Sequence, residues 1–185
     1  MKVTSQGLSG TKRTPQIPFQ TKPNSTTLEI ERRFLIKKIP ENCSDFTGEY
    51  IEQGYIETKE GTSIRIRQRE GVCYLTIKKG SGKIREEAEI IITQEQYNML
   101  WPITKNRRIK KTRYEISYNG HIIELDIYNG KLKGLITAEV EFPSEKDCDH
   151  FSPPQWFGKE VTDIKEYSNR SLAKFGLPLK QKLSL

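Results

Sequence analysis

The sequence predicts a mainly β domain in which eight antiparallel strands close into a barrel, with a few short helices packed outside. Three observations predict it. Short segments of alternating apolar and polar residues follow one another from Leu28 onward. Two-residue turn signals such as Asn119-Gly120 separate several of these segments, and few stretches show a helical period. Many antiparallel strands with few helices favour a sheet that closes on itself, because closure removes its exposed edges.

The chain divides into three parts. Residues 28–176 carry all the expected strands and helices and form one domain, a size that supports a real core. Residues 1–27 are rich in Ser, Thr, Pro, Gln and Lys without any periodicity, so we expect a disordered extension. Residues 177–185 form a C-terminal tail.

The expected strands share an alternation of side chains with a period of two. They are residues 28–36, 50–57, 62–70, 72–79, 84–92, 109–118, 120–128 and 135–142. Glu70-Gly71 and Asn129-Gly130 mark further turns. The stretch from Gly80 to Lys83 (GSGK) resembles part of a phosphate-binding loop, but the required Gly and Ser or Thr are missing at positions 77 and 84. We therefore interpret it as a hairpin turn.

Three short helices are expected. Thr93 with Gln96 forms a capping-box pattern that starts a helix, and Pro102 ends it. Ser144 starts a second helix, which ends before Pro153. Residues 167–175 have the composition of a third.

The composition excludes several classes of protein. The chain has no run of eighteen apolar residues and no apolar N-terminal stretch, so we expect a cytoplasmic protein without a membrane partner. Cys43, Cys73 and Cys148 are far apart and odd in number, which favours free thiols. His121 and His150 lack the spacing of metal ligands, so each is expected to be structural or exposed and not catalytic.

The positive net charge is partly an effect of the N-terminal extension. The whole chain carries +7, and residues 1–27 contribute Lys2, Lys12, Arg13, Lys22 and no acid, which leaves +3 for the rest. The excess argues only weakly for a nucleic-acid partner, so we do not expect one. The sequence does not determine the oligomeric state, and a homodimer remains open.

Charged residues are not scattered along the expected strands. Seven of the eight strands have a charged face opposite a largely apolar face, because residues two apart share a face. The acids on these faces are Glu29, Glu31, Glu87, Glu89, Glu124, Asp126, Glu139 and Glu141, and the bases are Arg33, Arg65, Arg67, Arg69, Lys78, Arg85, Lys111 and Arg113.

Two arrangements of these faces are open. Each strand taken singly fits a charged face in water and an apolar face on a core. The whole set fits this less well, because a solvated face would mix in Thr, Ser and Asn, whereas these faces carry paired Glu and paired Arg. Charged faces inside a barrel would need ion pairs and a ligand as partners. A polyphosphate with divalent cations suits both charge types, since guanidinium groups grip phosphates and paired carboxylates hold Mg²⁺ or Mn²⁺.

A family resemblance follows from the order of the motifs. EIERR (29–33), followed by FLI, resembles the ExExK signature of the CYTH proteins, also called triphosphate tunnel metalloenzymes. Further matching motifs run in order through residues 28–176: QGY (53–55), SIRIRQ (63–68), LTIKKG (75–80), REEAEI (85–90), KTRYE (111–115), ELDIYNG (124–130), AEVEF (138–142) and PPQWFGKEVT (153–162). The last of these and MLWP (99–102) are similar to short bacterial members that hydrolyse inorganic tripolyphosphate.

The resemblance implies a function and a site. It implies a tunnel open at both ends and a metal-dependent hydrolase that converts a small triphosphate, inorganic tripolyphosphate, to pyrophosphate and phosphate with Mg²⁺ or Mn²⁺. The implied metal ligands are Glu29, Glu31, Glu139 and Glu141, with Glu87, Glu89 and Asp126 as further candidates. The implied phosphate ligands are Arg33, Arg65, Arg67, Lys78, Arg85 and Arg113. Lys111 matches a lysine that assists the attacking water, and loss of the Glu31 carboxylate is expected to abolish turnover.

Arg33 departs from the signature, which usually has Lys at this position. The positive charge is kept, but a planar fork replaces a compact ammonium, so the fine position of a phosphate is open. Two alternatives also remain. A class IV adenylyl cyclase, or a thiamine or nucleoside triphosphatase, uses the same fold, although the sequence shows no convincing adenine pocket. A non-enzymatic polyanion binder is less compatible, because the clustered carboxylates would repel a bare polyanion.

Overall fold

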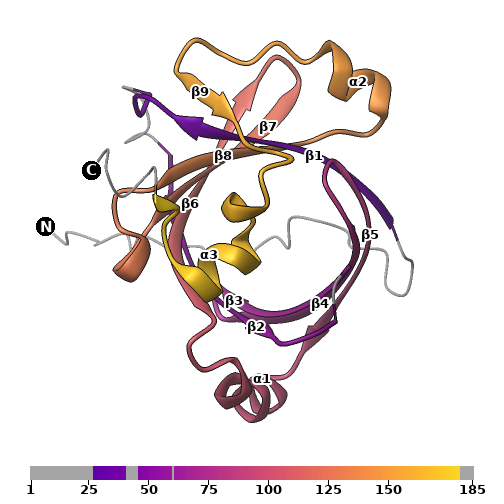
Figure 1. The fold of residues 1–185 in the computed structure, drawn as a ribbon, viewed down its shortest axis with the longest axis vertical. Helices are drawn as coiled ribbons and strands as arrows, with labels where there is room; N and C mark the ends of the chain where they lie inside the picture. The colour runs from indigo at the N-terminus through magenta and orange to yellow at the C-terminus, as the bar shows by residue number, and fades with distance from the viewer. Residues whose placement is uncertain (1–26, 41–45, 60, 180–185) are drawn as a thin grey trace, which may run out of the picture.

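The fold was obtained as a computed structural model that describes residues 27–40, 46–59 and 61–179. One antiparallel sheet runs in the order β5-β4-β3-β2-β6-β7-β8-β1, and pairing of β1 with β5 closes it into a ring of eight strands (Figure 1). The strands are β1 (Thr27–Ile36), β2 (Glu49–Ile56), β3 (Thr62–Arg69), β4 (Val72–Ser81), β5 (Ile84–Ile92), β6 (Arg108–Tyr118), β7 (His121–Tyr128), β8 (Ile136–Glu141) and β9 (Phe157–Glu160). The predicted eight-stranded barrel is confirmed, and each expected strand lies within two residues of its observed bounds.

The ninth strand was not expected from the sequence. β9 pairs with β1 on the outside of the ring, beside Phe34 and Ile36. It has only four residues and follows Pro153 and Pro154, so its alternation is too short to give a signal.

Tight turns set the register of the hairpins. Asn119 and Gly120 have φ angles of 48° and 80°, and Glu70 and Gly71 have φ angles of 49° and 81°. Two central residues with positive φ suit the right-handed twist of the flanking strands. The GSGK stretch joins β4 to β5, so its interpretation as a hairpin turn is confirmed.

The three predicted helices are present and short. They are α1 (Gln94–Leu100), α2 (Glu145–His150) and α3 (Asn169–Phe175), with 3₁₀ turns η2 (Trp101–Thr104), η3 (Gly130–Leu132) and η4 (Lys165–Tyr167). Thr93 caps α1 with the predicted capping box, and Pro102 ends the α-helix but is accommodated in η2. Ser144 and Ser168 cap α2 and α3 by accepting a hydrogen bond from a backbone N–H.

The apolar faces of the strands point outward, and much of this surface is covered. The segment from α2 to β9 covers the outer faces of β1, β7 and β8, where Phe34, Leu125 and Phe157 are buried together. α1 covers a second apolar cluster on β3 to β5. Coverage is incomplete, because Ile77 and Ile90 on the outer faces of β4 and β5 stay 43% and 47% exposed.

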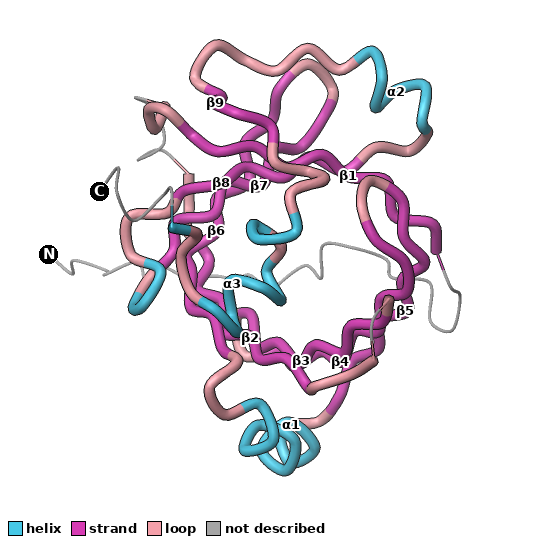
Figure 2. The backbone as a smooth tube through the Cα atoms, in the orientation of Figure 1, coloured by secondary structure: helices cyan, strands magenta, loops and turns pink. Residues whose placement is uncertain are grey.

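The C-terminal helix closes one end of the barrel. Figure 2 shows α3 within the outline of the ring, and Leu172 is fully buried against Tyr55, Ile109 and Tyr128. These three residues share the inward-facing positions of β2, β6 and β7. The expectation of a tunnel open at both ends is therefore wrong for this end, which we call the closed end.

Several predictions concern single residues outside the charged lumen. Cys73 and Cys148 are free and buried. His121 packs edge-on against aromatic rings, which agrees with a structural role. Three predictions concern residues outside the described ranges: the N-terminal extension apart from Thr27, residues 180–185 of the tail, and Cys43. Within the described part of the chain, no helix has the length and apolar content that a membrane span requires.

Candidate active site

The charged faces of the strands line the inside of the barrel, which confirms the inward arrangement. The predicted site contains fourteen residues, and thirteen of them form one continuous chain of ion pairs. The chain runs in the order Lys111, Asp126, Arg113, Glu139, Arg33, Glu31, Arg85, Glu29, Lys78, Glu87, Arg65, Glu89 and Arg67. Glu141 is the exception, since it makes no ion pair with any described residue.

Three acids stand close together, and we call them the acid trio: Glu29, Glu31 and Glu141. One carboxylate oxygen of each lies within 4.8 Å of the others, because Glu31 on β1 is the direct partner of Glu141 on β8. Burial, followed by repulsion from Glu124 and Glu29, raises the pKa of Glu141 to about 8, although its side chain reaches solvent. The pKa of Glu31 is also raised, chiefly by burial. Carboxylates crowded together in this way are a donor set that a hard divalent cation would neutralise.

Glu139 lies in a different environment from Glu141. Its Oε1 accepts hydrogen bonds from Nε of Arg33 (2.8 Å) and from Nδ2 of Asn169 (3.3 Å), and its Oε2 accepts from Arg113 (3.3 Å). Burial alone would raise the pKa of Glu139, but Arg33, Lys111 and Arg113 together hold it well below its usual range. Glu139 is thus a buried anion with basic partners on both oxygens.

Lys111 and Arg113 share a buried carboxylate inside the barrel. Lys111 is 2% exposed and pairs with Asp126, which is fully buried. Arg113 grips the same carboxylate with two hydrogen bonds of 2.7 Å. Burial and the charge of Arg113 lower the pKa of Lys111 to about 8, against the opposing effects of Asp126 and Glu139. A lysine with this pKa can exchange a proton near neutral pH.

The opposite wall carries the remaining bases. Arg65 and Arg67 both donate to Glu89, at 3.2 Å and 3.0 Å. Lys78 bridges Glu29 and Glu87. The Nε atoms of Arg65 and Arg67 are buried without a hydrogen-bond partner among the described residues. Such donors fit an anionic ligand, because a buried N–H group without an acceptor is destabilising.

Comparison with known proteins assigns the family. The CYTH domain profile matches residues 27–173. The chain belongs to the CYTH domain family. It is 42% identical over 147 residues to an inorganic triphosphatase of Nitrosomonas europaea, covering 78% of this chain and 96% of the relative. An inorganic triphosphatase of Acetivibrio thermocellus is 33% identical over 149 residues, covering 79% and 93%.

A solved structure supports the same assignment. The crystal structure of the inorganic triphosphatase NE1496 superposes with a TM-score of 0.61 at 39% identity, covering 81% of this chain and 97% of that chain. The resemblance inferred from the EIERR motif is therefore confirmed. Membership of this family implies a divalent metal ion, and the acid trio supplies a set of oxygen ligands that fits one.

The geometry explains the departure of Arg33 from the CYTH signature. Its guanidinium donates to Glu139 (2.8 Å), Glu31 (3.1 Å) and the backbone carbonyl of Tyr167 (3.2 Å). These acceptors lie on β8, on β1 and on the segment before α3. A planar fork reaches in several fixed directions at once, whereas an ammonium is a point charge. Arg33 thus connects the strands of the CYTH barrel to the C-terminal segment.

Sequence reasoning did not assign some lumen residues to the site. Glu124 accepts from Arg113, and Arg69 donates to Glu115 (2.7 Å) and pairs with Glu49. Glu124 and Arg69 were on the charged faces, so alternation could have found them. Asn169 carried no signal, because only the tertiary fold brings its helix to the lumen.

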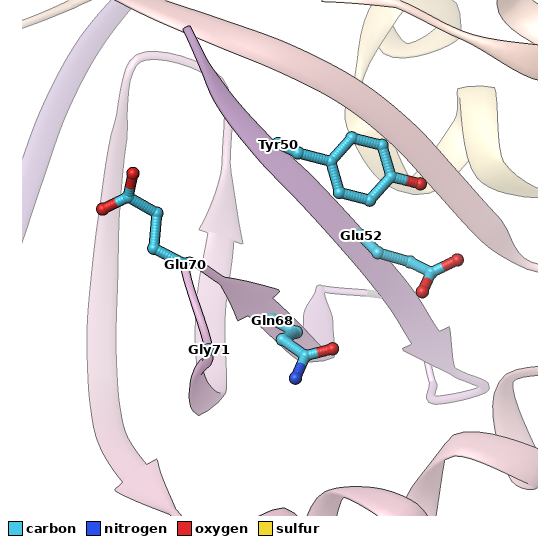
Figure 3. Close-up of a pocket in the computed structure, with 5 residues that line it drawn as sticks. All are labelled: Tyr50, Glu52, Gln68, Glu70 and Gly71. Carbon is cyan, nitrogen blue, oxygen red and sulfur yellow. The ribbon is translucent and has the colours of Figure 1, made fainter. Parts of the chain in front are cut away.

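A hollow on the outer surface is not the site. It has a volume of about 370 Å³, and Figure 3 shows residues of β2 beside residues of β3 and the following turn. None of its five lining residues is basic, so it does not match a phosphate. They are Tyr50, Glu52, Gln68, Glu70 and Gly71.

Proposed function

We propose that this CYTH protein hydrolyses inorganic tripolyphosphate to pyrophosphate and phosphate with Mg²⁺ or Mn²⁺. The observation that carries the proposal is the continuous ion-pair chain inside the barrel, which places Glu29 and Glu31 of the acid trio beside Arg85 and Lys78. The names of the two relatives and of the solved structure support the same activity.

Each type of charge in the lumen has a role in this proposal. Glu29, Glu31 and Glu141 would hold the metal ion, which supplies neutralisation of phosphate charge when it is bound. The other predicted acids would orient the bases that they pair with: Glu87, Glu89, Asp126 and Glu139. This division follows the spacing of the carboxylates, since the acid trio can offer three neighbouring oxygens to one ion. Each acid of the second group holds two basic side chains, as Glu29 and Glu31 also do.

The phosphates would be held by the basic side chains that the sequence predicted. They are Arg33, Arg65, Arg67, Lys78, Arg85 and Arg113. A phosphate oxygen that joins a base already held by a carboxylate gives that base a second anionic partner, and the buried Nε atoms of Arg65 and Arg67 offer donors for it. Guanidinium groups would also fix the direction of the phosphates through two parallel hydrogen bonds.

Lys111 would act as the general base that accepts the proton of the attacking water. A water oxygen attacks the terminal phosphorus, and its proton passes to the neutral Nζ of Lys111. The bridging P–O bond breaks, and its electron pair leaves with pyrophosphate. Asp126 then stabilises the ammonium that has formed. With a pKa of about 8, a substantial share of Lys111 is neutral at slightly alkaline pH.

The test is a phosphate-release panel. Tripolyphosphate, ATP, thiamine triphosphate and pyrophosphate would each be offered with Mg²⁺ and with Mn²⁺, and release is expected to be fastest from tripolyphosphate. No release with either metal from folded protein would overturn the proposal. Cyclic AMP formed from ATP would favour the cyclase alternative, and salt-sensitive binding without turnover would favour the polyanion binder.

A further inference from the structure

The first residue of α3 has an unusual set of partners at the closed end. Asn169 is 9% exposed, and both ends of its amide are used. Its Oδ1 accepts from the hydroxyl of Tyr128 (2.7 Å), and its Nδ2 donates to Oε1 of Glu139 (3.3 Å). An ionised carboxylate can only accept, so the amide nitrogen must face Glu139. Tyr128 therefore fixes the amide in the orientation that Glu139 requires.

Glu139 transmits this contact to two proposed phosphate ligands. The same Oε1 that accepts from Asn169 also accepts from Arg33, while Oε2 accepts from Arg113. A carboxylate held by three donors has little freedom to rotate. The direction of both guanidinium groups depends on it, because hydrogen bonds to a charged acceptor are directional and strong.

The docking of α3 has other supports. Arg170 donates to the backbone carbonyls of Thr62 (2.6 Å) and Thr58 (2.9 Å), which lie at the closed end of the wall. Leu172 and Ala173 are fully buried in the apolar cluster beneath the helix. The helix is thus anchored after Asn169 by contacts that do not reach the ion-pair chain.

We infer that Asn169 is a positioning residue that holds the Glu139 carboxylate and thereby aims Arg33 and Arg113 at the bound triphosphate. The inference rests on the proposed function. It makes the C-terminal helix a functional part of the site, in addition to a cover for one end of the barrel. Because Arg33 and Arg113 are proposed to bind the phosphates, loss of the Asn169 contact should weaken triphosphate binding as well as slow turnover.

The principal variant is Asn169→Leu, which keeps a similar volume and removes both hydrogen bonds. Its matched control is Arg170→Met, which keeps the apolar stem and removes the two bonds that anchor α3. We expect Asn169→Leu to lower kcat for tripolyphosphate with Mn²⁺ roughly tenfold or more, because small misplacements of binding groups are costly. Arg170→Met should lower the melting temperature at least as much and leave kcat unchanged.

A second arm measures binding without a metal ion. Isothermal titration of tripolyphosphate in EDTA reports on the basic side chains alone. Asn169→Leu is expected to weaken this binding about tenfold, and Arg170→Met to leave it unchanged. If wild-type protein binds but releases no phosphate, the proposed function fails, and this arm still decides the role of Asn169.

A double-mutant cycle with Tyr128→Phe tests the order of the contacts. The single change is expected to reduce kcat less than Asn169→Leu does, because the Asn169 amide keeps its bond to Glu139. The double variant should be no worse than Asn169→Leu, since Tyr128 acts through the amide. Additive losses would overturn this linkage. Unchanged kcat and binding in Asn169→Leu, or equal losses in Arg170→Met, would overturn the positioning role.

Discussion

Glu139 and Glu141 lie two residues apart on β8 and face the same lumen, but their surroundings are opposite. Across the β1–β8 pairing, Glu139 faces Arg33, whereas Glu141 faces Glu31. The pKa of Glu139 is held well below its usual range, and that of Glu141 is raised to about 8. The difference teaches that the register of one strand pair divides the lumen into a base-rich part near the closed end and an acid-rich part suited to a cation.

The largest expected effect concerns the acid-rich part. Glu31→Gln removes one charge of the acid trio at constant volume, and we expect metal-dependent phosphate release to fall roughly a thousandfold. The measurement is phosphate release across a Mn²⁺ titration. Glu86→Gln, at an exposed outward position of β5, is the matched control and should leave turnover unchanged. Turnover of Glu31→Gln within tenfold of wild type would contradict the assignment.

The next effect concerns the base-rich part. Glu139→Gln leaves Arg33 and Arg113 buried without this anion, which should lower the free energy of unfolding by about 3–5 kcal/mol at pH 7. Because the folded-state pKa is lowered, the wild-type advantage is present above about 4.5 and is lost as the pH falls below that value. Urea unfolding at pH 7 and at acidic pH checks both points. Equal stability of the two proteins at pH 7 would show that Arg33 and Arg113 do not need the Glu139 anion as a partner.

Lys111→Arg tests the proton step beside Glu139. Arginine keeps the charge but does not release its proton, so kcat should fall about a hundredfold. In the wild-type protein, kcat at saturating Mn²⁺ should rise as the pH passes about 8, because the neutral lysine accumulates, and the variant should lose this rise. Lys79→Arg, exposed on the outer face of β4, is the control. A wild-type rise that persists in Lys111→Arg would assign the titration to another group.

Glu141→Gln should change the free energy of unfolding in the opposite direction from Glu139→Gln. The folded-state pKa of Glu141 lies above its unfolded value, so its ionisation destabilises the fold progressively as the pH rises from about 4.5 to about 8. In EDTA above pH 8, the variant should be more stable than wild type by about 1 kcal/mol, since solvent screens part of the repulsion. Below about pH 4.5 the difference should vanish. Mn²⁺ should reverse the order, because the ion neutralises the acid trio. A variant less stable than wild type in EDTA would contradict the raised pKa.

Arg33→Lys has the smallest expected effect. It tests the residue that joins the two parts of the lumen, since Arg33 pairs with both Glu139 and Glu31. It restores the usual CYTH residue and keeps the charge beside Glu139 and Glu31, but it loses one contact of the fork, to the carbonyl of Tyr167. We expect a loss of roughly 0.5 kcal/mol in stability and about a threefold rise in KM for tripolyphosphate. Chemical unfolding and steady-state kinetics measure the two quantities. A loss as large as that of Glu139→Gln would mean that the contact to Tyr167 holds the closed end together.

Local sequence determined the strands, the hairpins and the composition of each face. Alternation with a period of two places Glu29, Glu31 and Arg33 on one side of β1 wherever that strand lies. Turns such as Asn119-Gly120 need positive φ angles, which Asn and Gly adopt readily, so the residue types alone indicate the turn. These properties depend on neighbours along the chain, so the barrel and most of its lumen residues were predictable.

Only the tertiary structure decided which charges oppose one another. The pairing of Glu141 with Glu31, the use of Glu139 by Arg33 and Asn169, and the lowered pKa of Lys111 all depend on segments that are distant in the sequence. The closure of one end by α3 depends on the same long-range packing. The physical reason is that side-chain direction is a local property of a strand, whereas burial and electrostatic environment are sums over every element that surrounds a group.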